Sequence, residues 1–403
     1  MNHSYGSRCP NPNAMQLSHT SILPFFIIMA IVTLFGAALV KFIPFYKREV
    51  EIEGSNRYET LDGLRGFLAF GVFFQHAVTN FAFFATGVWE ITPERFYRHL
   101  GGESVILFFI ITSFLYWSKA IAKKGNLDIM NLYRSRFLRL SPMYLVSAAI
   151  VTLAALIETR FSFVSIGTSI RDILSWLTMG LYTTTTVNGD SIIPINAGIH
   201  WTLHFEWIFY LFLPISALAL RSFEARLMLV PILAFAFTSP ERGYWMIFMF
   251  GIAAAHIVDR FPRWELAKRS WMGVAPILGL ILIYLIQYKP YSFVQYCVSL
   301  GVFLLFIYGN DLFGLLKTKA AKFLGTLSYS IYLMHGIVLY AVLHIANYFS
   351  PISQTTPQQF WSLILFSALV TVGVSTITYR YVEYPFLKMI QKRKAVDIEE
   401  KVM

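Results

Sequence analysis

The amino-acid sequence predicts an all-α protein, a polytopic transmembrane helical bundle of about 11 spans. Of the 403 residues, 56% are hydrophobic and only 14% are charged, whereas soluble domains carry about 25% charged residues. The hydrophobic residues also fall into long runs, and a helix that crosses a bilayer needs about 20 predominantly apolar residues. We therefore expect an integral membrane protein with short loops rather than a soluble enzyme on an anchor.

Eleven apolar runs are candidate spans. They cover residues 22–45, 62–86, 103–121, 142–160, 199–220, 226–240, 243–258, 272–288, 292–309, 326–349 and 360–384. Among basic residues only Arg8 precedes the first run, whereas Lys47 and Arg48 follow it. This is the reverse of the charge order in a cleaved signal peptide. We expect an uncleaved first span with the N-terminus outside.

The distribution of Lys and Arg supports this topology. With an external N-terminus, the predicted cytoplasmic segments hold 23 of the 33 basic residues and the external segments hold seven. The positive-inside rule predicts such an asymmetry. The C-terminus is then cytoplasmic, and the net charge of +11 needs no nucleic-acid partner to explain it. The two cysteines, Cys9 and Cys297, lie in unrelated contexts and predict neither a disulfide framework nor a metal cluster.

The chain divides into three parts. Residues 1–57 form an external tail, an extra helix and a cytoplasmic linker, residues 58–388 form the membrane domain, and residues 389–403 form a basic cytoplasmic tail. One external segment, from about Arg160 to Gly198, is long for a loop without a function. It either covers a site for an acceptor substrate or forms an interfacial helix followed by a linker.

Residues Leu61–Thr79 place Arg65 and His76 in one apolar helix. At about 100° per residue the two side chains share a face, about 16 Å apart along the axis. Asp62 lies one turn before Arg65. Ionisable groups at membrane depth are costly, which favours a buried polar track over a snorkelling arginine and a packed histidine. At this depth His76 can act as a general base on a hydroxyl group.

A basic segment precedes the fourth span. It reads YRSRFLRLSPMY and contains Arg134, Arg136 and Arg139. Guanidinium groups bind phosphate oxygens with two parallel hydrogen bonds, so the segment is a candidate phosphate site. The alternative is a flank that only follows the positive-inside rule. We expect Pro142 to begin the helix, where a proline is well tolerated.

The fifth span begins with HWTLHFEWIFY, where Glu206 lies about two turns inside the apolar run. A carboxylate there needs a partner, and we expect Glu206 to orient a histidine or an acceptor hydroxyl near the outer leaflet, beside Trp201 and His204. The i, i+4 spacing of His200 and His204 suits a metal, but zinc needs three or four ligands. We therefore expect no metal site.

Two further segments carry polar residues near the C-terminus. The stretch LSYSIYLMH holds His335 with Tyr329 and Ser330, either as a buried hydrogen-bond cluster or as a second part of the site. Glu383, beside Pro385, is expected to close the last helix in a structural role.

Taken together, these segments resemble the acyltransferase 3 family of integral-membrane acyltransferases, which includes bacterial O-antigen and nodulation-factor O-acetylases. The resemblance runs from about Tyr58 to Leu387 and rests on five motifs in the family's order. They are YETLDGLRGFLAFGVFFQHA with its Arg-x10-His pair, GGESVILFFIITSFLYW, RSRFLRLSPMY, HWTLHFEWIFYLFLP and YSIYLMHG. Thr112, Ser113 and Thr202 depart from the usual residues but keep a small or hydroxyl character.

The resemblance implies a membrane-bound O-acyltransferase with a ten-helix core after the extra first span. It implies transfer of an acyl group, most often acetyl from cytoplasmic acetyl-CoA, to a hydroxyl of a glycan or lipid-linked glycan such as lipopolysaccharide O-antigen, at a bacterial inner membrane. Acetyl-CoA is then a substrate and no bound cofactor is expected. Arg136 and Arg139, with Arg134, correspond to a donor site, Arg65 lies on the path of the pantetheine arm, and His76 with Glu206 carries the chemistry.

Two other interpretations remain open at this stage. The same fold could use a succinyl or longer acyl donor, or a small-molecule or lipid acceptor. A transporter or flippase could use the same polar track, although the sequence shows no internal repeat of the kind common in transporters. A scaffold protein is least expected, because it does not require buried Arg, His and Glu residues. The sequence does not predict the oligomeric state.

Overall fold

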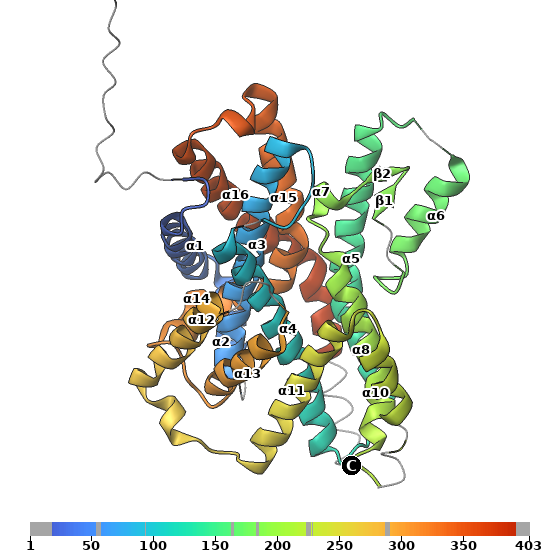
Figure 1. Cartoon of the computed structure of the whole chain (residues 1–403), viewed down its shortest axis with the longest axis vertical. Helices are drawn as coiled ribbons and strands as arrows, with labels where there is room; N and C mark the ends of the chain where they lie inside the picture. The colour runs from blue at the N-terminus through green and yellow to red at the C-terminus, as the bar shows by residue number, and fades with distance from the viewer. Residues whose placement is uncertain are drawn as a thin grey trace, which may run out of the picture.

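The computed structural model describes residues 18–53, 58–92, 94–162, 165–182, 185–222, 227, 229–286 and 291–391, and it is helical almost throughout (Figure 1). The α-helices are α1 Leu23–Phe42, α2 Pro44–Glu53, α3 Glu59–Thr86, α4 Arg95–Ala122, α5 Ile129–Glu158, α6 Ile166–Trp176, α7 Ile193–Asn196, α8 His200–Leu218, α10 Leu229–Thr238, α11 Arg242–Arg260, α12 Val274–Ile286, α13 Phe293–Ile307, α14 Lys319–Thr326, α15 Ser328–Phe349 and α16 Pro357–Thr378. The expected all-α fold is confirmed. The predicted tail over residues 1–17 and most of the predicted tail over 389–403 lie outside the described residues.

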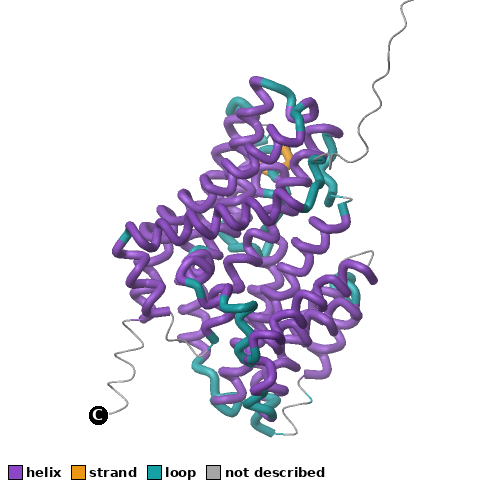
Figure 2. The backbone as a smooth tube through the Cα atoms, turned by 90° about the vertical axis from the view of Figure 1, so that its left-hand side faces the viewer, coloured by secondary structure: helices purple, strands orange, loops and turns teal. Residues whose placement is uncertain are grey.

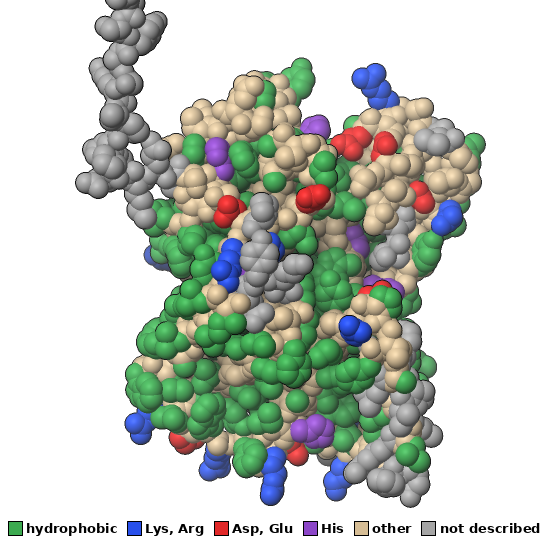
Figure 3. All heavy atoms as spheres, viewed as in Figure 1, with side chains coloured by type: hydrophobic (Ala, Val, Ile, Leu, Met, Phe, Trp, Pro, Cys, Tyr) green, Lys and Arg blue, Asp and Glu red, His purple; other side chains and the backbone are tan. Residues whose placement is uncertain are grey.

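Each of the eleven predicted apolar runs contains a helix. Among the described residues, six helices are long and apolar enough to cross a bilayer: α1, α3, α4, α5, α15 and the continuous helix Pro357–Gln391. Figure 3 shows hydrophobic side chains gathered in a broad band across the molecule, with Lys and Arg side chains along its lower edge. The chain is therefore an integral membrane protein, while the full number of 11 spans stays a prediction because α10, α12 and α13 are short.

Helix α3 lies at the centre of the bundle and packs against α4, α14 and α15 (Figure 1). Glycines allow the close approach to α14. A Cβ atom on Gly66 would lie 2.5 Å from Leu324, and one on Gly325 would lie 1.7 Å from the backbone oxygen of Asp62. Since interiors are packed as densely as organic crystals, these contacts leave little freedom for α3 to shift. The helix that carries Arg65 and His76 is thus rigidly held.

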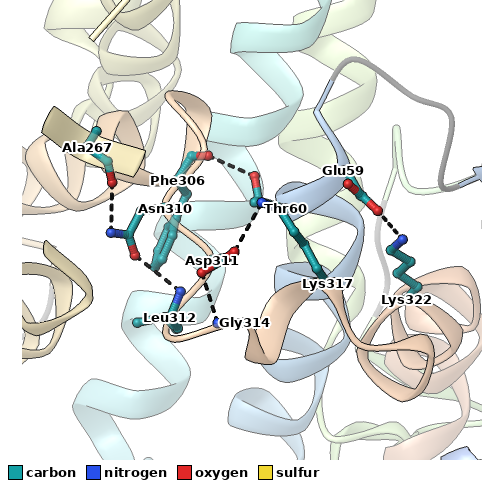
Figure 4. A network of polar contacts seen from close by, with 10 residues as sticks. All are labelled: Glu59, Thr60, Ala267, Phe306, Asn310, Asp311, Leu312, Gly314, Lys317 and Lys322. Carbon is teal, nitrogen blue, oxygen red and sulfur yellow. Dashed lines mark hydrogen bonds and ion pairs between the residues drawn. The ribbon is translucent and has the colours of Figure 1, made fainter. Parts of the chain in front are cut away.

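Polar contacts also fix the N-terminal end of α3 (Figure 4). The Thr60 hydroxyl donates a hydrogen bond of 2.8 Å to the carbonyl of Phe306 at the end of α13. Glu59 forms an ion pair with Lys322 on α14. These bonds join α3 to two neighbours within one turn, so its rotation about its own axis is determined.

Helix α5 begins thirteen residues earlier than the sequence predicts. Its N-cap is Asp128, whose carboxylate accepts a hydrogen bond of 3.0 Å from the backbone N–H of Asn131. Pro142 consequently lies inside the helix and does not begin it. A proline there removes one backbone hydrogen bond, which neighbouring hydroxyl groups can replace in membrane helices. Ser141 next to it donates to the carbonyl of Phe137.

The last helix also continues past its predicted end. A π-helical turn, Tyr379–Glu383, follows α16, and the helix runs on to Gln391. Pro385 therefore does not close it. Turns of π-helix are rare and often lie at functional sites, and this one places Glu383 in the interior of the bundle, where its side chain is fully buried.

The long segment between α5 and α8 folds into α6, a two-strand hairpin and α7. The strands are β1 Thr186–Val187 and β2 Asp190–Ser191, which pair antiparallel and appear in orange in Figure 2. Ser169 on α6 bonds to Asn188 in the hairpin at 2.8 Å. The opposite side of α6 exposes an apolar stripe that includes Ile166 and Leu174. This arrangement agrees with the interfacial-helix alternative.

Helix α7 closes one side of the bundle. A Cβ atom on Gly336 of α15 would lie 2.5 Å from the backbone carbonyl carbon of Asn196. The two backbones are therefore in direct contact. The contact on α15 is at Gly336, the residue after His335. The segment that the sequence marks as unusually long thus packs against the residue that follows His335, one of the predicted site residues.

Candidate active site

A cavity of about 470 Å³ lies between α3, α4, α5, α8, α15 and the end of the last helix. This volume falls in the range typical of small-molecule sites. Its charged lining residues are Arg65, Arg136, Arg139, Lys119, Glu206, Asp62 and Glu49. Four of these seven are cations, so the cavity is suited to an anionic ligand.

Arg136 and Arg139 enter the cavity from one face of α5. The Arg136 guanidinium carbon lies 4.9 Å from the ring centroid of Tyr116 and 5.8 Å from that of Tyr210. Arg139 lies 3.6 Å from the Glu383 carboxylate. Aromatic rings and a carboxylate hold the two arginines in defined positions. The structure thus brings two of the three predicted phosphate ligands to one wall.

Arg134 does not join them. Its side chain is exposed, and it is absent from the cavity lining. Arg134 precedes Arg136 by two residues, which is about 200° around a helix. The sequence interpretation placed Arg136 and Arg139 on one face of a helix end, with Arg134 close by as a further phosphate ligand, and only the pair on one face reaches the cavity.

Arg65 and Glu206 complete the polar surface of the cavity. Arg65 lies 3.9 Å from Asp62 one turn away, with 31% of its side chain exposed. Glu206 accepts a hydrogen bond from Tyr210 on its own helix. A carboxylate facing three arginines offsets part of their charge and leaves a net positive cavity.

The cavity has an open end and a closed end. The exposed residues Lys119 and Gln391 lie at the open end. At the closed end, Tyr332 and Thr202 share a hydrogen bond of 2.7 Å between their hydroxyl groups. Phe108 packs against the Tyr332 ring at 6.2 Å. All three side chains line the cavity, and Tyr332 also borders the next layer of the bundle.

That next layer holds His76 and His335. Nδ1 of His76 lies 2.9 Å from Nε2 of His335, and the two rings are within 7° of parallel. His335 is fully buried and His76 is half-buried. The His335 ring lies 5.9 Å from that of Tyr332. The pair therefore lies directly behind the closed end of the cavity.

The hydrogen-bond partner of His76 is thus His335, 259 residues away. The sequence left open whether Glu206 orients a histidine or the acceptor hydroxyl, and the structure does not pair Glu206 with His76. Glu206 contacts Tyr210 and faces the arginines. Helix α8 points Glu206 into the cavity, whereas the histidine pair is formed by α3 and α15. The two predicted catalytic groups belong to separate layers.

The remaining residues near the start of α8 have other partners. His204 bonds to the carbonyl of Gly180 at 2.9 Å, while His200 bonds to Asn196 at 2.9 Å. Trp201 packs on Tyr244, with ring centroids 4.7 Å apart. Among the described residues no three His, Cys, Asp or Glu side chains group together in a way that could hold a metal ion.

Ser330 and Tyr329 lie near the same cavity. Tyr329 lines it and donates a hydrogen bond of 2.8 Å to the carbonyl of Leu140. Ser330 donates to the carboxylate of Glu383. Sequence reasoning assigned Glu383 only a role in ending the helix. The signal available was a carboxylate in an apolar run, which was applied to Glu206 and not to Glu383.

Comparison with known proteins agrees with this geometry. Residues 58–380 match the family profile of an acyltransferase domain, Acyl_transf_3. No curated protein and no solved structure is significantly similar to the chain. The matched region spans α3 to the end of α16 and includes every residue of the cavity and the histidine layer except Glu49 and the last turns of the final helix. The chain therefore belongs to the acyltransferase 3 family and is a membrane acyltransferase.

Proposed function

We propose that the protein moves an acetyl group from cytoplasmic acetyl-CoA to a hydroxyl group of a cell-surface glycan, such as O-antigen or a lipid-linked sugar, at a bacterial inner membrane. The single observation that carries this proposal is the position of the cationic cavity directly behind the His76 and His335 layer. One helix, α3, contributes Arg65 to the cavity and His76 to the layer beyond it. A donor bound at one level can thus present its acyl group at the next.

The cavity supports binding of the donor. Coenzyme A carries several phosphate charges at one end and a thioester at the end of a flexible arm. Arg136 and Arg139 provide guanidinium groups of the kind that bind phosphate oxygens, and exposed Lys119 lies at the open end. By the positive-inside rule, we expect this end, which is rich in Lys and Arg, to face the cytoplasm, where coenzyme A is made.

The histidine layer supports the chemistry. In the proposed step, Nε2 of His76 takes the proton of an acceptor hydroxyl while the hydroxyl oxygen attacks the thioester carbonyl carbon. The carbon–sulfur bond breaks, the oxygen–carbon bond forms, and the coenzyme A thiolate takes the proton back from His76. A transient acyl-His76 is the alternative route to the same products.

The closed end of the cavity adds one requirement. Tyr332 lines the cavity with its ring 5.9 Å from that of His335, and it is held by a hydrogen bond to Thr202 and by packing against Phe108. The thioester must therefore pass these side chains, or they must turn aside, before transfer takes place. The acceptor hydroxyl reaches His76 from the other side, where the Trp89 ring lies 6.5 Å from that of His76.

The proposal is tested with purified protein in nanodiscs, radiolabelled acetyl-CoA and an extract of bacterial glycans and glycolipids. We expect acetyl-CoA to be consumed and label to appear on a glycan in an ester bond. Label on a lipid or small molecule would overturn the glycan acceptor. Consumption of succinyl-CoA or a longer acyl-CoA in place of acetyl-CoA would overturn the acetyl donor.

A further inference from the structure

We propose that His335 is a positioning residue that holds His76 in the tautomer with a free lone pair on Nε2. This inference rests on the proposed role of His76 as the base and deepens it. In a neutral imidazole one ring nitrogen carries the hydrogen and the other accepts, and the hydrogen bonds determine which. Two successive hydrogen bonds, one to each ring, fix the tautomers of both His335 and His76.

The first of these hydrogen bonds joins the His335 ring to the backbone of α15. Nδ1 of His335 lies 3.2 Å from the carbonyl oxygen of Ile331, one turn earlier on the same helix. A carbonyl oxygen can only accept, so Nδ1 of His335 carries the hydrogen. Because a charge inside a membrane protein is costly, the fully buried His335 is neutral, and its Nε2 is an acceptor.

The second hydrogen bond determines the tautomer of His76. Nε2 of His335 accepts the only hydrogen bond between the two rings, at 2.9 Å, so Nδ1 of His76 is the donor. The neutral His76 ring then has no hydrogen on Nε2. Among the described residues no side chain or backbone group bonds to that nitrogen. This pattern of hydrogen bonds leaves the Nε2 lone pair of His76 available to the hydroxyl group of the proposed acceptor.

The same contact serves during turnover. When Nε2 of His76 takes the hydroxyl proton, the ring becomes an imidazolium that donates from both nitrogens. His335 continues to accept from Nδ1 and so stabilises the positive charge without taking any proton. When the thiolate leaves, the proton on Nε2 returns to it and the pair is restored. An orienting partner of this kind, a buried carboxylate in serine proteases, affects rate by fixing the tautomer.

The surroundings hold His335 in place. Gly336 next to it is in contact with the backbone of α7, and Tyr332 one turn earlier is bonded to Thr202 on α8. Rotation of α15 would break both contacts. The position of the His335 ring is therefore determined by three helices.

The first test compares two substitutions of His335. His335→Phe keeps a planar ring but has no acceptor, and we expect kcat to fall about 100-fold while the KM for the acyl donor stays within about threefold. His335→Gln places an amide oxygen near the former Nε2, and we expect it to recover at least about tenfold of that loss. His344→Phe, the same change at an exposed position of α15, is the matched control and keeps wild-type kinetics.

A second measurement does not depend on turnover. Nitrogen-15 NMR of histidine-labelled protein in lipid bilayers reports which ring nitrogen is protonated, and the His76 signals are identified by their loss in His76→Ala. We expect His76 of the wild type to be protonated on Nδ1, and we expect His335→Phe to shift it toward protonation on Nε2.

Two results would overturn the inference. One is a wild-type His76 protonated on Nε2, or a tautomer that His335→Phe does not change. The other is His335→Gln as inactive as His335→Phe while both remain folded. If the protein transfers no acyl group at all, the proposed function fails, but the NMR measurement still decides whether His335 sets the tautomer.

Discussion

The cavity and the histidine layer differ in almost every physical property, although α3 connects them. The cavity is about 470 Å³ in volume, open at one end and lined by seven charged residues. The histidine layer has two uncharged rings in direct contact, and His335 in it is fully buried. One region is suited to binding an anion, and the other to holding a pair of imidazole rings in a fixed hydrogen-bonded arrangement.

The difference indicates a division of labour. Charged groups in a wide cavity attract and hold a ligand but do not distinguish its reacting atoms. Proton transfer needs a group in a fixed tautomer at a short distance. Separating the two tasks along one helix allows each environment to be optimised without disturbing the other. Substitutions in the two regions are therefore expected to produce different kinetic defects.

The largest effect is expected from His76→Ala. Loss of the proposed base should reduce kcat by about 10³-fold, because positioned bases contribute about 10² to 10⁴. The KM for the acyl donor should change little, since His76 does not line the cavity. Steady-state kinetics with the purified variant, with circular dichroism to verify folding, checks this. Normal turnover of the variant would show that His76 is not the catalytic base.

A smaller effect, on binding, is expected from the double variant Arg136→Ala, Arg139→Ala. Charge-assisted hydrogen bonds contribute about 1.5 to 3 kcal/mol each, so donor affinity should fall by about 100-fold or more. Isothermal titration with coenzyme A measures it. Arg134→Ala is the matched control, because Arg134 lies on the same helix but outside the cavity. Equal losses in both variants would mean that the cavity does not hold the phosphates.

Packing above the histidine layer is tested by Gly336→Val. The new side chain would overlap the backbone of Asn196, and overpacking costs about 1 to 3 kcal/mol. We expect a lower temperature of thermal unfolding and a reduced kcat. The control is Gly373→Val on α16, where an added Cβ meets no atom within 4 Å. If the control is destabilised as much, close contact between α7 and α15 is not the cause.

The smallest effect is expected at the boundary between the two regions. Tyr332→Phe removes the hydroxyl bonded to Thr202, a hydrogen bond that contributes about 0.5 to 1.5 kcal/mol. We expect kcat to change by only about 2- to 10-fold, with donor KM unaffected. Thr202→Val should give a similar change, and the double variant should show no further effect. Additive effects would show that the two hydroxyls act independently.

Much of the fold could be predicted from the sequence because its signals are local. Apolar runs identify the membrane helices without knowledge of their neighbours. The separation of Arg65 and His76 follows from helix geometry once the stretch is known to be helical. The start of α5 was missed although Asp128, three residues before Asn131, is a typical N-cap signal. The run of arginines after it hid the helix because it interrupts the apolar pattern.

The contacts between helices could not be predicted in the same way. His76 and His335 are brought together by the packing of α3 against α15. Neither segment contains a sequence signal that identifies the other as its neighbour. The pairing of Arg139 with Glu383 likewise joins two distant helices. A single sequence shows which polar residues are costly to bury, but it does not show which of them form hydrogen bonds or ion pairs with one another. For this reason the sequence did not predict that His335 is the hydrogen-bond partner of His76.

In the proposed mechanism, donor binding and acyl transfer take place at two separate levels along α3. The most direct test measures both quantities on the same variants: the equilibrium affinity for coenzyme A, and the single-turnover rate at saturating acetyl-CoA. We predict that His76→Ala binds coenzyme A like the wild type but does not transfer the acetyl group. The double arginine variant should bind weakly yet retain a near-normal rate once saturated. If both variants lose binding and rate to the same extent, the two regions form one site and the account is wrong.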